Sequence, residues 1–121
     1  MMRHMLLSKI HRATVTACDL EYEGSLTIPR ESVEAAGLLA GEQILVANLS
    51  TGARFETYVM VGEKKGEFRL NGAAARLGAP GDRIIVMAFA WMDAGEAARH
   101  EPRLVYVDEK NRIVRVEGPG T

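Results

Sequence analysis

Two segments of the chain place charged and phenolic side chains at every second position. Lys9 and His11 alternate near the N-terminus, and the later segment RFETYV carries Arg54, Glu56 and Tyr58. Alternate residues of a β-strand share one face, so each set projects from one side if its segment is a strand. A guanidinium pairs with a carboxylate, and a phenol can deliver a proton. The pattern indicates a site for an anionic substrate, with a solvated face and a cross-strand salt-bridge ladder as the alternatives.

Two short glycine-containing stretches can also carry chemistry. Gly24 and Ser25 separate two extended segments, which predicts either the tip of a β-hairpin or a chemical role for the Ser25 hydroxyl. The stretch NGAAA begins at Asn71 and is typical of a turn that leads into a helix. Because its side chains are small, the backbone N–H groups at the start of that helix could instead bind a carboxylate.

Other site chemistries lack the residues that they require. His4, His11 and His100 have no metal-ligand spacing with one another or with Cys18, so no metal site is predicted. The stretch GAPGD lacks the lysine and the following helix of a phosphate-binding loop. No nucleophile elbow surrounds Ser25, because the second glycine of the Gly-x-Ser-x-Gly motif is missing.

Composition places these residues in one globular domain, residues 1–121. A hydrophobic share of 47% and a charged share of 26% over 121 residues suit a soluble protein with a real core. A net charge of −1 gives no basic footprint for nucleic acid. The single Cys18 fits a reducing compartment, and no segment resembles a signal peptide or a membrane span. We therefore expect a cytoplasmic protein without a nucleic-acid or membrane partner.

The elements that must position the candidate residues are mainly short strands. Strands are expected within residues 6–22 (one or two strands), 43–49, 54–62, 68–70, 83–92 and, as a hairpin, 103–116. The strand 83–92 is the most apolar and is expected at the centre. Helical pieces are expected within residues 29–43, with Pro29 in the first turn and Gly37 closing the helix, and within 71–82 and 93–100, while 117–121 reads as a frayed tail. Many short strands with small helices between them predict a compact β-barrel.

The order of the segments closely resembles that of the bacterial aspartate 1-decarboxylases, a family of pyruvoyl-dependent enzymes that make β-alanine for pantothenate biosynthesis. The similarity runs from about Met5 to Asp93 and rests on the motifs KIHRA, YEGS, GxRFxTY and NGAAA, which are specific in combination. The resemblance implies a double-psi β-barrel, in agreement with the strand pattern. It also implies a homotetramer with active sites near the subunit interfaces.

The same resemblance implies that the chain cleaves itself between Gly24 and Ser25. In the family, the serine hydroxyl attacks the preceding carbonyl, and the resulting ester eliminates and hydrolyses to an N-terminal pyruvoyl group. Because Gly24 has no Cβ, a strained conformation that exposes its carbonyl is accessible there. Thr57 matches the donor that stabilises the oxyanion. A pyruvoyl group made from Ser25 is therefore the expected covalent cofactor.

The remaining family positions imply how L-aspartate is bound and decarboxylated. The substrate amine condenses with the pyruvoyl ketone to a Schiff base, which accepts the electrons released as CO2 leaves. Tyr58 matches the proton donor to the carbanion. Lys9 and Arg54 match the cations that bind the carboxylates, with Arg54 on the retained one. The other substrate-binding positions that the resemblance implies are Thr57, Asn71, Gly72, Ala73 and Ala74.

Thr57 and Tyr58 pose a geometric question. Neighbouring residues of a strand point to opposite faces of the sheet, yet both residues are matched to one site. A β-bulge within the strand, or a site shared between subunits, would reconcile the two assignments.

A DNA-binding module is the competing interpretation. The stretch GSLTIPRESVEAAGLLAGEQI, residues 24–44, resembles the core of swapped-hairpin transcription factors of the AbrB type. Those proteins bind DNA as dimers through basic loops. The match covers this stretch alone, and a net charge of −1 offers little phosphate neutralisation. The enzyme is therefore the preferred hypothesis.

Overall fold

The computed structural model describes residues 1–119, which form nine β-strands, two α-helices and one 3-10 helix. The strands are β1 (Met2–Thr14), β2 (Ala17–Asp19), β3 (Ser25–Pro29), β4 (Gln43–Asn48), β5 (Arg54–Gly62), β6 (Arg69–Asn71), β7 (Arg83–Asp93), β8 (Arg103–Val107) and β9 (Ile113–Glu117). The helices are α1 (Arg30–Ala36), α2 (Ala94–Arg99) and the 3-10 helix η1 (Gly72–Leu77). The prediction of a mainly β protein with short helices is confirmed.

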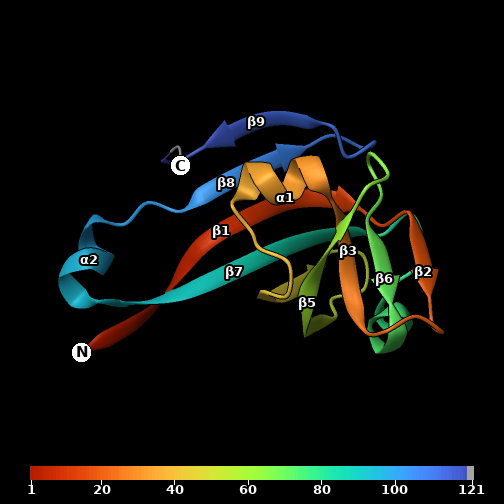
Figure 1. Ribbon diagram of the computed structural model, residues 1–121, viewed down its shortest axis with the longest axis horizontal. Coiled ribbons are helices and arrows are strands. Elements are labelled where there is room, and N and C mark those ends of the chain that lie inside the picture. The colour runs from red at the N-terminus through yellow and green to blue at the C-terminus, as the bar shows by residue number, and fades with distance from the viewer. Residues whose placement is uncertain (120–121) are drawn as a thin grey trace.

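The nine strands form one mixed sheet in the order β2-β6-β3-β5-β4-β7-β1-β8-β9. β1 pairs in parallel with β8, β2 with β6, and β3 with β5, whereas the other neighbours are antiparallel. In Figure 1 the long strands β1 and β7 run side by side along the molecule, while β3, β5 and β6 run steeply across one end of it. This change of strand direction within one sheet agrees with the barrel-like fold that was expected.

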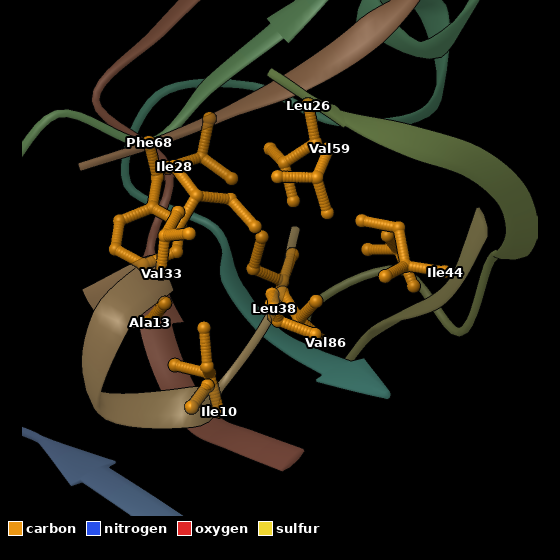
Figure 2. Packing of buried hydrophobic residues seen from close by; sticks show 14 of the residues in the cluster. Ile10, Ala13, Leu26, Ile28, Val33, Leu38, Ile44, Val59, Phe68 and Val86 are labelled. Atoms are coloured by element: carbon orange, nitrogen blue, oxygen red, sulfur yellow. The ribbon is translucent and has the colours of Figure 1, made fainter. Parts of the chain in front are cut away.

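Alternating apolar residues of the central strands fill the interior. β7 lies between β4 and β1, as expected for the most apolar strand, and its Ile84, Val86 and Ala88 are buried. Figure 2 shows Val86 among buried side chains of several elements, including Leu26 of β3 and its paired neighbour Val59 of β5. Burying a side chain of this size contributes roughly 1.5–3 kcal/mol. The core therefore holds β3 and β5 firmly in register.

Several element boundaries differ from the expected ones. β1 begins at Met2, because its exposed first residues pair with β7 although they show no apolar alternation. β6 begins at Arg69, since the backbone of the buried Phe68 instead hydrogen-bonds Thr16. Glu117 belongs to β9 and not to a tail, and residues 120–121 of the expected tail lie outside the described part of the chain.

Helix α1 follows β3 directly and ends where the sequence predicts. Pro29 was expected in the first helical turn, but it has an extended backbone and is the last residue of β3, so the helix begins one residue later. Gly37 closes the helix with a φ of +70°, a left-handed conformation that favours glycine. The Ser8 hydroxyl of β1 donates to the Ala36 carbonyl at 2.6 Å. This bond joins the end of the helix to the strand that Figure 1 shows running beneath it.

Candidate active site

Ser25 is the first residue of β3 and lies opposite Asn71 of β6. Both residues have 0% exposure. The Asn71 Nδ2 donates to Ser25 Oγ at 2.9 Å and to Thr27 Oγ1 at 2.9 Å. The Ser25 hydroxyl in turn donates to the Glu23 carbonyl at 3.3 Å. A buried hydroxyl with hydrogen bonds on two sides therefore directly follows Gly24.

The Gly24–Ser25 bond does not lie at the tip of a hairpin. β6 lies between β2 and β3 in the sheet, paired in parallel with β2 and antiparallel with β3. Residues 20–24 must therefore cross from one side of β6 to the other. The hairpin interpretation of this segment is wrong, because the two strands that flank it are not neighbours.

Helix η1 begins with a glycine whose backbone lies against the segment before Ser25. Gly72 has a φ of +62°, and a Cβ at this position would lie 2.7 Å from the Cα and N of Gly24 and 2.8 Å from the Tyr22 carbonyl oxygen. Gly24 itself is exposed and lies outside the left-handed region. Of the two next residues of η1, Ala73 is exposed and Ala74 is buried. Of these two glycines, Gly72 is therefore the one whose missing side chain allows the two backbone segments to lie close together.

Strand β5 brings Tyr58 beside Ser25. β3 and β5 are parallel, with Leu26 paired to Val59. The residues one position earlier, Ser25 and Tyr58, therefore lie level on neighbouring strands, share a face, and have strand axes about 4.8 Å apart. Tyr58 is 37% exposed to solvent. The structure thus places an accessible phenol next to the buried serine.

Thr57 points to the other face of β5. It shares that face with Phe55, which packs against the hydrophobic core, and is half-buried. The pairing of β5 with β4 runs without a shift from Arg54 to Tyr58. No bulge therefore reverses the orientation of Thr57 or Tyr58 in this ladder, and that explanation of their joint assignment is wrong. Their hydroxyls lie on opposite sides of the strand.

Lys9 and Arg54 lie on the same face of the sheet as Ser25, but at a distance from it. A row of paired residues runs across the sheet from Lys9 of β1 to Glu56 of β5, two residues from Arg54. Four strand spacings separate Lys9 from Ser25, about 19 Å, and four residues of β5 separate Arg54 from the level of Ser25, about 13 Å. Measured along the sheet, these cations are therefore several strands or residues away from the serine.

Comparison with known proteins identifies the family. The chain matches the aspartate decarboxylase family model over residues 1–114. It is 55% identical over 113 residues to the aspartate 1-decarboxylase of Pelotomaculum thermopropionicum, covering 93% of this chain and 86% of that protein. The enzymes of that name from Chlorobaculum parvum and Caldicellulosiruptor bescii are 54% and 52% identical, with 93% of this chain and 88% of each relative covered. The chain belongs to the aspartate decarboxylase family.

Membership of the aspartate decarboxylase family accounts for far more of the chain than the DNA-binding alternative, which rested on residues 24–44. Within residues 1–119, no helix is long and apolar enough to cross a membrane. The same residues contain no group of three or more His, Cys, Asp or Glu side chains placed to hold a metal ion.

Three residues that contact the candidate site of this decarboxylase-family chain were not predicted from the sequence. Thr27 shares the Asn71 amide with Ser25, the Arg69 Nε donates to the Asn71 Oδ1 at 2.8 Å, and the Arg69 guanidinium lies 5.1 Å from the centroid of the Tyr22 ring. Period-2 spacing could have found two of them. Residues 25 and 27 alternate on one strand and residues 69 and 71 on the next, so all four share one face.

His11 lies on the same face as Lys9 and close to several cations. Burial lowers the pKa of the His11 imidazole, and the positive charges of Lys9, Arg12 and Arg83 lower it further. Its Nδ1 is buried and has no hydrogen-bond partner among residues 1–119. The ring makes an edge contact with Tyr106, with centroids 5.6 Å apart. The side chains of Lys9, Arg12 and Arg83 give this face a positive charge.

Proposed function

We propose that this chain is a pyruvoyl-dependent aspartate 1-decarboxylase, which converts L-aspartate to β-alanine and CO2 in the cytoplasm for pantothenate biosynthesis. The observation that carries the proposal is membership of the family, at 55% identity over 93% of the chain. The environment of Ser25 supports it, because a reactive hydroxyl must be held in a fixed position beside the bond that it attacks.

The first step is cleavage of the chain at its own Gly24–Ser25 bond. The Ser25 hydroxyl attacks the Gly24 carbonyl carbon; the C–N bond breaks as the C–Oγ bond forms, and the hydroxyl proton ends on the freed amine. Loss of the Ser25 α-proton then breaks the Cβ–Oγ bond, which releases residues 1–24 as a carboxylate and leaves dehydroalanine. Water replaces the amine, ammonia leaves, and residues 25–121 begin with a pyruvoyl group.

Two donors would stabilise the negative charge that develops in this cleavage. Thr57 lies two positions before Val59, so it is level with Gly24 on the neighbouring strand. Its hydroxyl is the donor assigned to the oxyanion on the Gly24 carbonyl. The Asn71 amide donates to the Ser25 oxygen itself at 2.9 Å, which favours the charged form of that oxygen.

The pyruvoyl ketone supplies the electron sink that decarboxylation of an amino acid requires. The surroundings of residue 25 fit such a group, because the position is fully buried next to the amide of Asn71. Tyr58, level with residue 25 on β5, delivers the proton to the carbon that loses CO2. Gly72, Ala73 and Ala74 are assigned to the substrate-binding loop by their match to the family.

Lys9 and Arg54 are assigned to the substrate carboxylates across a subunit interface. Their separation from Ser25 by about 13–19 Å within one chain favours a site completed by a second copy of the chain, in a homotetramer. Arg54 clamps the retained side-chain carboxylate through paired hydrogen bonds. Lys9 lies nearer the carboxylate that leaves, where a clamp would oppose the loss of charge.

Intact-mass spectrometry of the purified protein tests this function. We expect two products, residues 1–24 and a chain of residues 25–121 without a free N-terminal amine, together with β-alanine formation from L-aspartate. Ser25→Ala should remain full-length and inactive. Ser32→Ala is the matched control, because Ser32 is a buried serine whose hydroxyl has no partner among residues 1–119. A full-length, active Ser25→Ala protein would refute the proposal.

A further inference from the structure

The side-chain amide of Asn71 has only one orientation that satisfies its neighbours. The Arg69 Nε donates to the Asn71 Oδ1 at 2.8 Å. A guanidinium carries donors and no acceptor, so the amide atom that faces it must be the oxygen. The NH2 group is thereby directed to the other side, where it donates to the hydroxyl oxygens of Ser25 and Thr27 at 2.9 Å each.

The orientation of this amide decides whether Ser25 is activated. With the NH2 group on Ser25 Oγ, negative charge that develops on the oxygen during attack is stabilised, and the hydroxyl proton is directed to the Glu23 carbonyl. With the amide reversed, its oxygen would accept the Ser25 proton and hold the hydroxyl in its neutral form. The two orientations of the Asn71 amide occupy almost the same space, yet they have opposite effects on the Ser25 hydroxyl.

Arg69 also contacts the segment on the other side of the scissile bond. Its guanidinium lies 5.1 Å from the centroid of the Tyr22 ring, a cation–π contact. Tyr22 belongs to residues 20–24, which cross β6 before Ser25, and its carbonyl lies against Gly72. One half-buried side chain therefore contacts both the residue that orients the nucleophile and the segment that carries the bond to be cleaved.

We propose that Arg69 is a positioning residue for self-cleavage at Gly24–Ser25, which acts by fixing the Asn71 amide with its NH2 group on the Ser25 hydroxyl. The assignment rests on the self-cleavage in the proposed function. It concerns maturation, since Arg69 acts through Asn71 and Tyr22 and not on the reacting atoms.

The test compares cleavage rates of freshly expressed precursors by intact mass. Arg69→Met keeps the length of the side chain but removes the donor and the charge, and should slow cleavage roughly tenfold, less than the loss expected for a direct oxyanion donor. Arg76→Met is the matched control, because Arg76 is an exposed arginine on the neighbouring η1, and it should cleave at the wild-type rate. Tyr22→Leu removes only the cation–π contact and should have a smaller effect.

Chemical rescue separates positioning from a structural role. Millimolar ethylguanidinium added to an Arg69→Ala precursor should restore much of the cleavage rate, whereas ethylammonium, which lacks the planar donor, should not. The melting temperature of the precursor should stay close to that of the wild type. Wild-type cleavage by Arg69→Met, or slow cleavage without rescue, overturns the role of Arg69 and leaves self-cleavage intact. A wild-type chain that never cleaves overturns both proposals.

Discussion

Two neighbouring side chains of β5 are proposed to serve different reactions. Thr57 and Tyr58 are adjacent in an unbroken ladder, so their hydroxyls lie on opposite faces, with Thr57 toward the core and Tyr58 beside Ser25. Such hydroxyls act at different positions on the neighbouring strand. This geometry favours Thr57 as a donor in cleavage and Tyr58 as a donor in decarboxylation.

Substitution of these two hydroxyls should separate maturation from turnover. Thr57→Val should slow cleavage by about 10²–10³-fold, the usual loss for removal of one oxyanion donor. Tyr58→Phe should cleave normally but form β-alanine poorly, because only the proton donor is lost. Intact mass measures the first reaction and amino-acid analysis the second. A Tyr58→Phe protein that fails to cleave would show that this division of roles is wrong.

His11 should make the folded state sensitive to acid. Its pKa is lowered in the folded protein, first by burial and then by Lys9, Arg12 and Arg83, from an ordinary value of 6.5. The unfolded chain therefore binds the proton more readily, and the contribution of His11 to stability is complete above pH 6.5 and lost as the pH falls below it. Denaturant unfolding at pH 7.5 and pH 5.5 should show a smaller decrease for His11→Gln than for the wild type. An equal decrease in both proteins would contradict this assignment.

At the scale of elements, the approach of η1 to residues 20–24 depends on the missing side chain of Gly72. Gly72→Ala places a Cβ 2.7 Å from Gly24 and should displace the scissile segment, with slow cleavage as the result. Gly37→Ala is the matched control, since Gly37 has a φ of +70° and no atom of residues 1–119 within 4 Å of such a Cβ. Both variants should lose about 1 kcal/mol or more for the left-handed backbone. Only Gly72→Ala should lose cleavage, as measured by intact mass.

Element type was predictable from the sequence where the signal is local. The continuous apolar run of residues 83–92 predicted β7, and Gly37 predicted the end of α1 from its own conformational preference. The parallel pairing of β3 with β5 was not predictable, because it joins segments distant in sequence through the packing of residues such as Leu26 and Val59. The same pairing places Tyr58 beside Ser25, so this part of the candidate site could be predicted only through the family resemblance.

The contacts of Arg69 were beyond the sequence for a different reason. Period-2 spacing places Arg69 on the same face as Asn71, but an arginine at a half-buried strand position is usually a solvated side chain, so the spacing alone does not indicate that the two side chains form a hydrogen bond. The separation of Lys9 and Arg54 from Ser25 was equally hidden, because it depends on how many strands lie between them. Residue types indicated an anion site, whereas the strand order separates its two cations from Ser25 along the sheet.

At the scale of the whole molecule, the proposed site should be shared between subunits. An Arg54→Ala chain retains Ser25, and a Ser25→Ala chain retains Arg54, so each homo-oligomer should be inactive. Co-expression of the two chains should restore a clear fraction of β-alanine formation, because some interfaces then combine one intact residue from each. Co-expression of Arg54→Ala with a Ser25→Ala, Arg54→Ala double variant is the control and should stay inactive. Equal activity in the two mixtures would place Arg54 outside a shared site.

The position of β1 affects whether the protein can refold before and after cleavage. β1 lies between β7 and β8 and buries Ile10 and Ala13 completely, so residues 1–24 would stay within the sheet after cleavage at Gly24–Ser25. Before cleavage, closing that sheet is an intramolecular event. Afterwards it would be a bimolecular one, with a central strand supplied by a separate peptide and the original peptide bond gone. Unfolding would then be reversible for the precursor but not for the cleaved enzyme. A heated mature enzyme would show hysteresis that its precursor lacks.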